Sequence, residues 1–272
     1  VLFRTSVIFD VSCPVGSPAS ASPITMTVKA KPSTPSVTNG GAICDGNTLS
    51  IIGPTVAGAS YSWTGPNSFT STNQSPNITN ATTSASGSYS LQVTVNGCTS
   101  DAGTTVASVK TIPTIATTSP STRCGTGTVN LGATASAGTV SWYSASSGGS
   151  SLSTGASYTT PSISSNTTYY VDATNNGCTT TSRTSVLASI TAIPSAPTGT
   201  ASQSFCSGAS PKVSDLTATG TSILWYSASS GGSSLSTGLS LTDGNHYYAS
   251  QKVSGCESSS RSEEHTSELQ SH

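Results

Sequence analysis

Seven cysteines are the residues whose type and spacing best define a chemistry in this sequence. They are Cys13, Cys44, Cys98, Cys124, Cys178, Cys206 and Cys256. After the first, they fall into three successive pairs separated by 54, 54 and 50 positions, and none has the short Cys-x₂₋₄-Cys spacing of a zinc site. The spacing predicts the disulfides Cys44–Cys98, Cys124–Cys178 and Cys206–Cys256, with Cys13 free. Such a framework indicates an oxidising compartment, extracellular or at the cell surface.

Catalytic constellations are weak by comparison. A serine hydrolase needs a nucleophile, a histidine and an orienting acid, but His246 is the only histidine outside the last twelve residues. It follows Asp243-Gly244-Asn245, which is typical of a turn. The sequence therefore predicts no catalytic residue, no cofactor and no enzyme.

Two short acidic stretches were weighed as calcium ligands. Asp45-Gly46-Asn47 and Asp243-Gly244-Asn245 offer oxygen atoms, but neither continues into a twelve-residue loop with a distal glutamate. Both are ordinary turn sequences. We expect no metal site.

Three tryptophans recur once per repeat, and two of them precede a tyrosine. Trp63, Trp142 and Trp225 are expected in the core. Because neighbouring strand side chains point to opposite faces, Tyr143 and Tyr226 are expected to face outward. They are the candidate contacts for a glycan ligand.

Composition narrows the class of partner. Only 7% of the 272 residues are charged and the net charge is −1, so no basic surface for nucleic acid is expected. No stretch approaches the roughly 20 apolar residues of a membrane span. A surface glycan or a protein remains the possible ligand, and the sequence does not identify which.

The elements that must position these residues form repeats. Trp142–Gly155 returns unchanged as Trp225–Gly238. Proline-containing linkers begin the repeats at Lys31–Pro35, Ile112–Thr114 and Ile193–Pro197. The expected division is residues 1–30, the last strands of a truncated module; 31–111, the first repeat; 112–192, the second repeat; 193–260, the third repeat; and 261–272, a non-native tail.

The local pattern within each repeat is all-β. Short alternating runs of Val, Ile, Thr and Tyr are separated by turns such as Asn96-Gly97 and Asn176-Gly177, and no helical periodicity extends over a useful length. In the first repeat, a Leu-x-Ile strand, Trp63 and Gly87–Leu91 resemble the immunoglobulin pattern of strands B, C and F. We therefore expect tandem β-sandwiches.

The series Cys…W-Y-x-A-x-x-G-G…Y-Y…N-G-C…S-R-T resembles the bacterial Ig-like domains of large secreted or cell-surface adhesins, often exported by the type IX route. The second and third repeats match it over nearly their full length, and the first resembles an Ig- or PKD-like variant. The resemblance implies a non-catalytic structural and adhesive stalk segment. Two alternatives stay open: a carbohydrate- or protein-binding array, and accessory domains of a secreted hydrolase.

The last twelve residues differ from the rest in composition. Residues 261–272 hold three of the four glutamates and two of the three histidines. After Arg261, the position where the second repeat has the strand Thr184–Ile190 carries charged residues without apolar alternation. The segment resembles a translated sequencing adapter, and we expect it to be irregular and the third repeat to lack its last strand.

Overall fold

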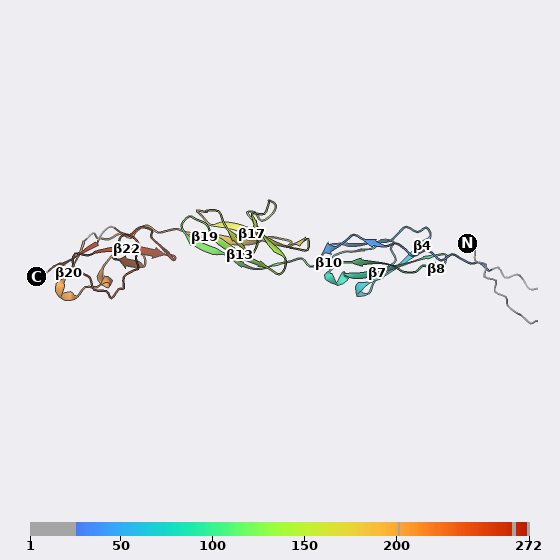
Figure 1. Ribbon diagram of the computed structural model, residues 1–272, viewed down its shortest axis with the longest axis horizontal. Coiled ribbons are helices and arrows are strands. Elements are labelled where there is room, and N and C mark those ends of the chain that lie inside the picture. The colour runs from blue at the N-terminus through green and yellow to red at the C-terminus, as the bar shows by residue number, and fades with distance from the viewer. Residues whose placement is uncertain (1–25, 201, 263–264, 271–272) are drawn as a thin grey trace, which may run out of the picture. The chain divides into compact units, whose positions relative to one another are not determined.

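The computed structural model describes residues 26–200, 202–262 and 265–270. Strands and one-turn 3₁₀ helices make up its regular elements, as the all-β pattern predicts (Figure 1). The described 3₁₀ helices are η1 (Pro66–Ser68), η2 (Thr83–Ala85), η3 (Ser207–Ala209) and η4 (Val213–Asp215).

The chain divides into two compact units. The first contains residues 26–39, Ser50–Pro76 and Ser88–Val106, and the second contains Gly40–Leu49, Asn77–Gly87 and the chain from Ala107 onward. Each is described by itself.

In the first unit, a sheet with the order β5-β4-β7-β8 carries the tryptophan of the first repeat. Trp63 on β4 is 1% exposed and is the Cα partner of Leu91 on β7. A Cβ atom added at Gly53 would lie 3.2 Å from Trp63 Cζ2 and 3.1 Å from Leu91 Cδ2, so the chain leaving β3 covers this core. Fully buried Ile51 on β3 contributes to it. The strands are β1 (Thr38–Asn39), β3 (Leu49–Ile52), β4 (Ala59–Gly65), β5 (Phe69–Ser71), β7 (Gly87–Val95), β8 (Cys98–Thr99) and β9 (Gly103–Ala107).

In the second unit, the second repeat forms two sheets with a continuous core between them. Their strand orders are β11-β13-β16 and β12-β19-β17-β14-β15, with β18 paired to β17 (Figure 1). Trp142 is fully buried, is the Cα partner of Val171, and belongs to one cluster with Leu131. Its Nε1 donates to the Gly155 carbonyl at 2.9 Å. The strands are β11 (Ile115–Ser119), β12 (Ser121–Cys124), β13 (Asn130–Ala135), β14 (Thr139–Tyr143), β15 (Ser153–Thr154), β16 (Ser157–Thr159), β17 (Thr167–Asn175), β18 (Cys178–Thr179) and β19 (Thr184–Thr191).

The third repeat repeats this plan with fewer strands. Its sheet has the order β20-β24-β22-β21, with β23 paired to β22. Trp225, 6% exposed, packs with Val213, Leu216 and Tyr247. The strands are β20 (Ser202–Cys206), β21 (Ile223–Tyr226), β22 (His246–Val253), β23 (Cys256–Glu257) and β24 (His265–Gln270).

The expectation of an irregular tail is wrong for residues 265–270. β24 pairs in parallel with β20 and antiparallel with the start of β22, where His246 is the partner of Thr266. Just before it, the Ser262 backbone N–H donates to the Ala249 carbonyl at 2.8 Å. The composition argument failed because an open sheet edge offers backbone donors and acceptors, which a strand of any polar composition can pair with.

Two short strands of the second unit close the first repeat. β2 (Ile43–Cys44) pairs in parallel with β10 (Val109–Lys110), and Val109 is 5% exposed. Backbone bonds flank the pair, from Ile43 N to Ser108 O at 3.0 Å and from Asp45 N to Lys110 O at 2.8 Å. The remaining strand is β6 (Asn77–Ile78).

Candidate functional site: disulfides between successive repeats

Two disulfides link successive repeats in the same staggered manner. Cys44 bonds Cys178 across a Cα–Cα distance of 5.7 Å, and Cys124 bonds Cys256 across 5.6 Å. In both, the first cysteine of one repeat joins the second cysteine of the next. All four residues lie in the second compact unit.

The predicted pairing within each repeat is therefore wrong. The partners expected for Cys44, Cys124 and Cys256 were Cys98, Cys178 and Cys206. Instead, Cys98 and Cys206 are free, the first half-buried and the second exposed. The expectation for Cys13 lies outside the described residues.

The second repeat gives the physical reason. Cys124 ends β12, which runs parallel to β19, and it is the partner of Thr191 at the last residue of that strand. Cys178 follows β17, which runs antiparallel to β19 and passes the first residue of β19 at Val171. The two cysteines thus lie at opposite ends of an eight-residue strand, on the order of 25 Å long at about 3.3 Å per residue. A disulfide needs Cα atoms within roughly 7 Å.

A lysine and a tight turn complete the first junction. Asn176 and Gly177, with φ of 51° and 85°, form the turn before Cys178. Lys110 is the strand partner of Cys44, and its Nζ donates to the Asn176 carbonyl at 2.9 Å. The Cys44 Sγ lies 4.0 Å from the Gly177 carbonyl oxygen. The end of one repeat therefore sits on the turn of the next through both a disulfide and a charge-assisted hydrogen bond.

The candidate glycan-contacting tyrosines are covered by arginines. The Arg183 guanidinium carbon lies 3.2 Å from the centroid of the Tyr143 ring, and that of Arg261 lies 3.4 Å from the centroid of Tyr226. Tyr143 is half-buried and Tyr226 is 5% exposed. The prediction of an outward aromatic surface is wrong for Tyr226. Alternation does place the tyrosine opposite the tryptophan, but the sequence pattern does not reveal that an arginine stacks over its ring.

Each arginine also holds the loop that follows the tyrosine. Arg183 Nη1 donates to the Ala145 and Gly148 carbonyls at 2.8 and 2.7 Å, and its Nε lies 3.3 Å from Asp172 Oδ2. Arg261 likewise donates to the Ala228 carbonyl. We call these two arrangements the arginine clamps. They give the conserved-length loop after each Trp-Tyr pair a fixed conformation.

The third repeat obtains its acid from a different position. Glu257 Oε1 accepts hydrogen bonds from Tyr226 Oη at 2.6 Å and from Ser250 Oγ at 2.5 Å. These bonds, the one from Ser250 foremost, hold the pKa of Glu257 below its ordinary value of 4.5. Burial raises the pKa of Tyr226 above 10. Both shifts keep the Tyr226 hydroxyl protonated and donating to a carboxylate at neutral pH.

The acidic turns and His246 do not converge on a site. Among the residues that the structure describes, no three His, Cys, Asp or Glu side chains group as a metal ion would require. His246 begins β22 and is exposed. Asp45 lies beside the first junction, where its Oδ1 is buried without a hydrogen-bond partner.

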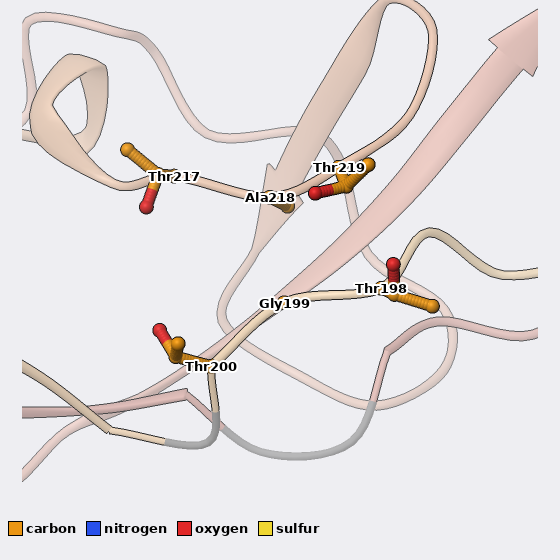
Figure 2. A pocket seen from close by; sticks show the side chains of 6 residues that line it. All are labelled: Thr198, Gly199, Thr200, Thr217, Ala218 and Thr219. Atoms are coloured by element: carbon orange, nitrogen blue, oxygen red, sulfur yellow. The ribbon is translucent and has the colours of Figure 1, made fainter.

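A hollow in the third repeat has no chemistry of its own. It has a volume of about 350 Å³ and lies beside the bridge in which Thr198 N donates to Thr219 O at 3.1 Å. Figure 2 shows that its lining consists of threonines and small residues. Without a charged or nucleophilic side chain, this lining does not form a catalytic site. No helix in the described part of the chain has the length and apolar character needed to cross a membrane.

Comparison with known families gives a match over more than half of the chain. The model of the "Ig-like domain CHU_C associated" family matches residues 111–191 and again 194–266. The second match continues into β24, in agreement with the strand found there. No curated protein matches the chain.

Solved structures with similar folds are tandem β-domains. The three N-terminal domains of the highly immunogenic outer capsid protein of bacteriophage RB49 are 14% identical, with 87% of this chain and 99% of that chain covered and a TM-score of 0.39. A three-domain Ig structure of titin is 13% identical, with 87% and 99% covered and a TM-score of 0.39. Fibronectin(III)-like modules of Clostridium thermocellum CbhA are 19% identical, with 57% and 94% covered and a TM-score of 0.31. At these values the likenesses say nothing about function.

Proposed function

Because the chain belongs to the family of CHU_C-associated Ig-like domains, we propose that it is a non-catalytic structural and adhesive stalk segment of an extracellular bacterial surface protein. The observation that carries the proposal is the pair of disulfides between successive repeats. A tandem array whose neighbours are bonded twice, by the linker and by a disulfide, is suited to transmitting tension along its length.

The disulfides act by removing chain from the path along which force travels. Tension that reaches Cys44 crosses to Cys178 without extending the intervening repeat halves, and tension at Cys124 crosses to Cys256. The proline linkers Ile112–Thr114 and Ile193–Pro197 lie inside the bridged segments. Unfolding of one repeat under load would therefore lengthen the segment only modestly.

The extracellular location follows from the same bonds. Disulfides form and persist in oxidising compartments outside the cytoplasm. The low charge and abundant Ser and Thr suit an exposed segment without a nucleic-acid partner.

The test is single-molecule stretching of the oxidised and reduced chain. A stalk role requires the oxidised chain to resist extension far beyond the reduced one. Equal extension of the two forms would remove the basis of the proposal. Glycan-array binding of the oxidised chain separates the alternative of a carbohydrate-binding array. We expect no binding through Tyr143 or Tyr226, because the arginine clamps cover their rings.

A further inference from the structure

Cys98 has the surroundings of a junction from which one strand is missing. The Cys44–Cys178 junction contains four parts: the turn Asn176-Gly177, the cysteine after it, Lys110 on the turn, and a β2 strand whose cysteine lies beside that lysine. We compare the region around Cys98 with these four parts.

Three of the four parts are present at Cys98. Asn96 and Gly97, with φ of 51° and 83°, form the same turn before the cysteine. Lys29 Nζ donates to the Asn96 carbonyl at 2.8 Å, as Lys110 does to Asn176 at 2.9 Å. The Cys98 Sγ lies 3.9 Å from the Lys29 carbonyl oxygen. The turn, the lysine and the thiol are therefore arranged as in the bonded junction.

The residue before the lysine marks what is missing. Val28 precedes Lys29 as Val109 precedes Lys110, but Val28 is 87% exposed and Val109 is 5% exposed. Met26 is 85% exposed as well. In the first repeat, Val109 lies in the strand paired with β2. An exposed Val-Lys pair beside a free thiol thus presents an uncovered edge with the polarity of that pairing.

We propose that Cys98 and the segment Thr27–Lys29 form a receiving site for a cysteine-terminated strand of another Ig-like repeat of this family. The strand lies parallel to Thr27–Lys29. Its backbone N–H groups donate to the Thr27 and Lys29 carbonyls, as Ile43 and Asp45 donate to Ser108 and Lys110. Its cysteine forms a disulfide with Cys98. The site extends the proposed stalk role by naming the partner of an open end.

The bond forms by thiol–disulfide exchange, so no separate oxidant is needed. The Cys98 thiolate attacks the sulfur of a strand cysteine that is held as a mixed disulfide with glutathione. The new bond joins Cys98 to the strand, and glutathione leaves as its thiolate and takes up a proton. One disulfide is consumed and one is formed.

The test uses the full oxidised chain and a synthetic peptide with the sequence of residues 36–46, Ser-Val-Thr-Asn-Gly-Gly-Ala-Ile-Cys-Asp-Gly, as its glutathione mixed disulfide. Cys206 is the internal reference, since it is free and more exposed than Cys98. The control peptide carries proline at the positions of Ile43 and Asp45, which removes the two N–H donors. Peptide-level mass spectrometry counts the adducts on each cysteine.

We expect oxidised glutathione and the proline peptide to modify Cys206 before Cys98. The strand peptide should raise the ratio of Cys98 to Cys206 adducts by about tenfold over the proline peptide, and Lys29→Ala should lower that gain. Equal ratios for the two peptides, or a strand peptide that prefers Cys206, would overturn the proposal. The readout is a bond at Cys98, whereas the stalk role is tested by extension under force, so either can fail without the other.

Discussion

Reduction of the two disulfides should lengthen the fully stretched chain by an amount fixed by the pairing. Between Cys44 and Cys256 the backbone contains 212 residues. With both bonds intact, the shortest covalent path crosses from Cys44 to Cys178, returns along the chain to Cys124 and crosses to Cys256, so it contains only 54. Reduction releases the other 158 residues, about 550 Å at roughly 3.5 Å per residue. Atomic-force or optical-trap stretching with handles at the two chain ends measures this difference.

Reduction alone does not separate the two pairing schemes. Pairing within repeats would also leave 54 residues in the path, because 26 residues join Cys98 to Cys124 and 28 join Cys178 to Cys206. The discriminating variant is Cys98→Ser. In the staggered scheme Cys98 is free, so the oxidised length stays the same. A gain of about 190 Å, equal to 54 residues, would refute the staggered pairing. Cys178→Ser is the positive control and should add 26 residues, about 90 Å.

Three further predictions concern the fold around the junctions. Trp142→Ala should lower the free energy of unfolding by about 3–5 kcal/mol in denaturant titration, because it empties a fully buried position, whereas Leu187→Ala, on the same repeat but 42% exposed, should cost less than about 1 kcal/mol; equal effects would contradict the core assignment. Arg183→Lys should destabilise the loop after Tyr143 by about 1 kcal/mol and speed its proteolysis, since lysine cannot stack on the ring and donate to both carbonyls; an unchanged cleavage rate would argue against the clamp. The Glu257 pKa is depressed in the folded chain, so its stabilisation is present above pH 4.5 and is lost as the pH falls through the folded pKa; Glu257→Gln should flatten the acid limb of thermal stability, and an unaltered limb would show that the carboxylate contributes nothing.

The tandem fold and its core could be predicted from local patterns. The alternation in each strand and the single tryptophan per repeat suffice to place Trp63, Trp142 and Trp225 in the interior, because burial of a large aromatic in strand C depends on residues close in the repeat. The β24 strand was missed for the opposite reason. Its pairing depends on the open edges of β20 and β22, and the composition of residues 265–270 carries no signal for them.

The disulfide pairing could not be settled from spacing. In a regular array, the separations within repeats are nearly constant at 54, 54 and 50, and the separations between repeats are nearly constant too, at 134 and 132. Periodicity alone is therefore compatible with both schemes. The deciding fact is that the first cysteine ends a strand parallel to the last strand of its repeat, so it leaves the repeat at the end where the next one begins. Parallel pairing between the second and last strands of a repeat has no local sequence signature.

Staggered pairing has a consequence for arrays of this repeat that pairing within repeats does not have. If the first cysteine of each repeat bonds the second cysteine of the next, every interior repeat contributes both of its cysteines, and one open cysteine remains at each end of any array. Cys206, beside the last strand of the third repeat, and Cys98, after the turn of the first, occupy those two positions here. The same geometry that excludes a bond within one repeat thus makes each end of the array complementary to the other. The covalent rule for joining two repeats is also the rule for adding a third.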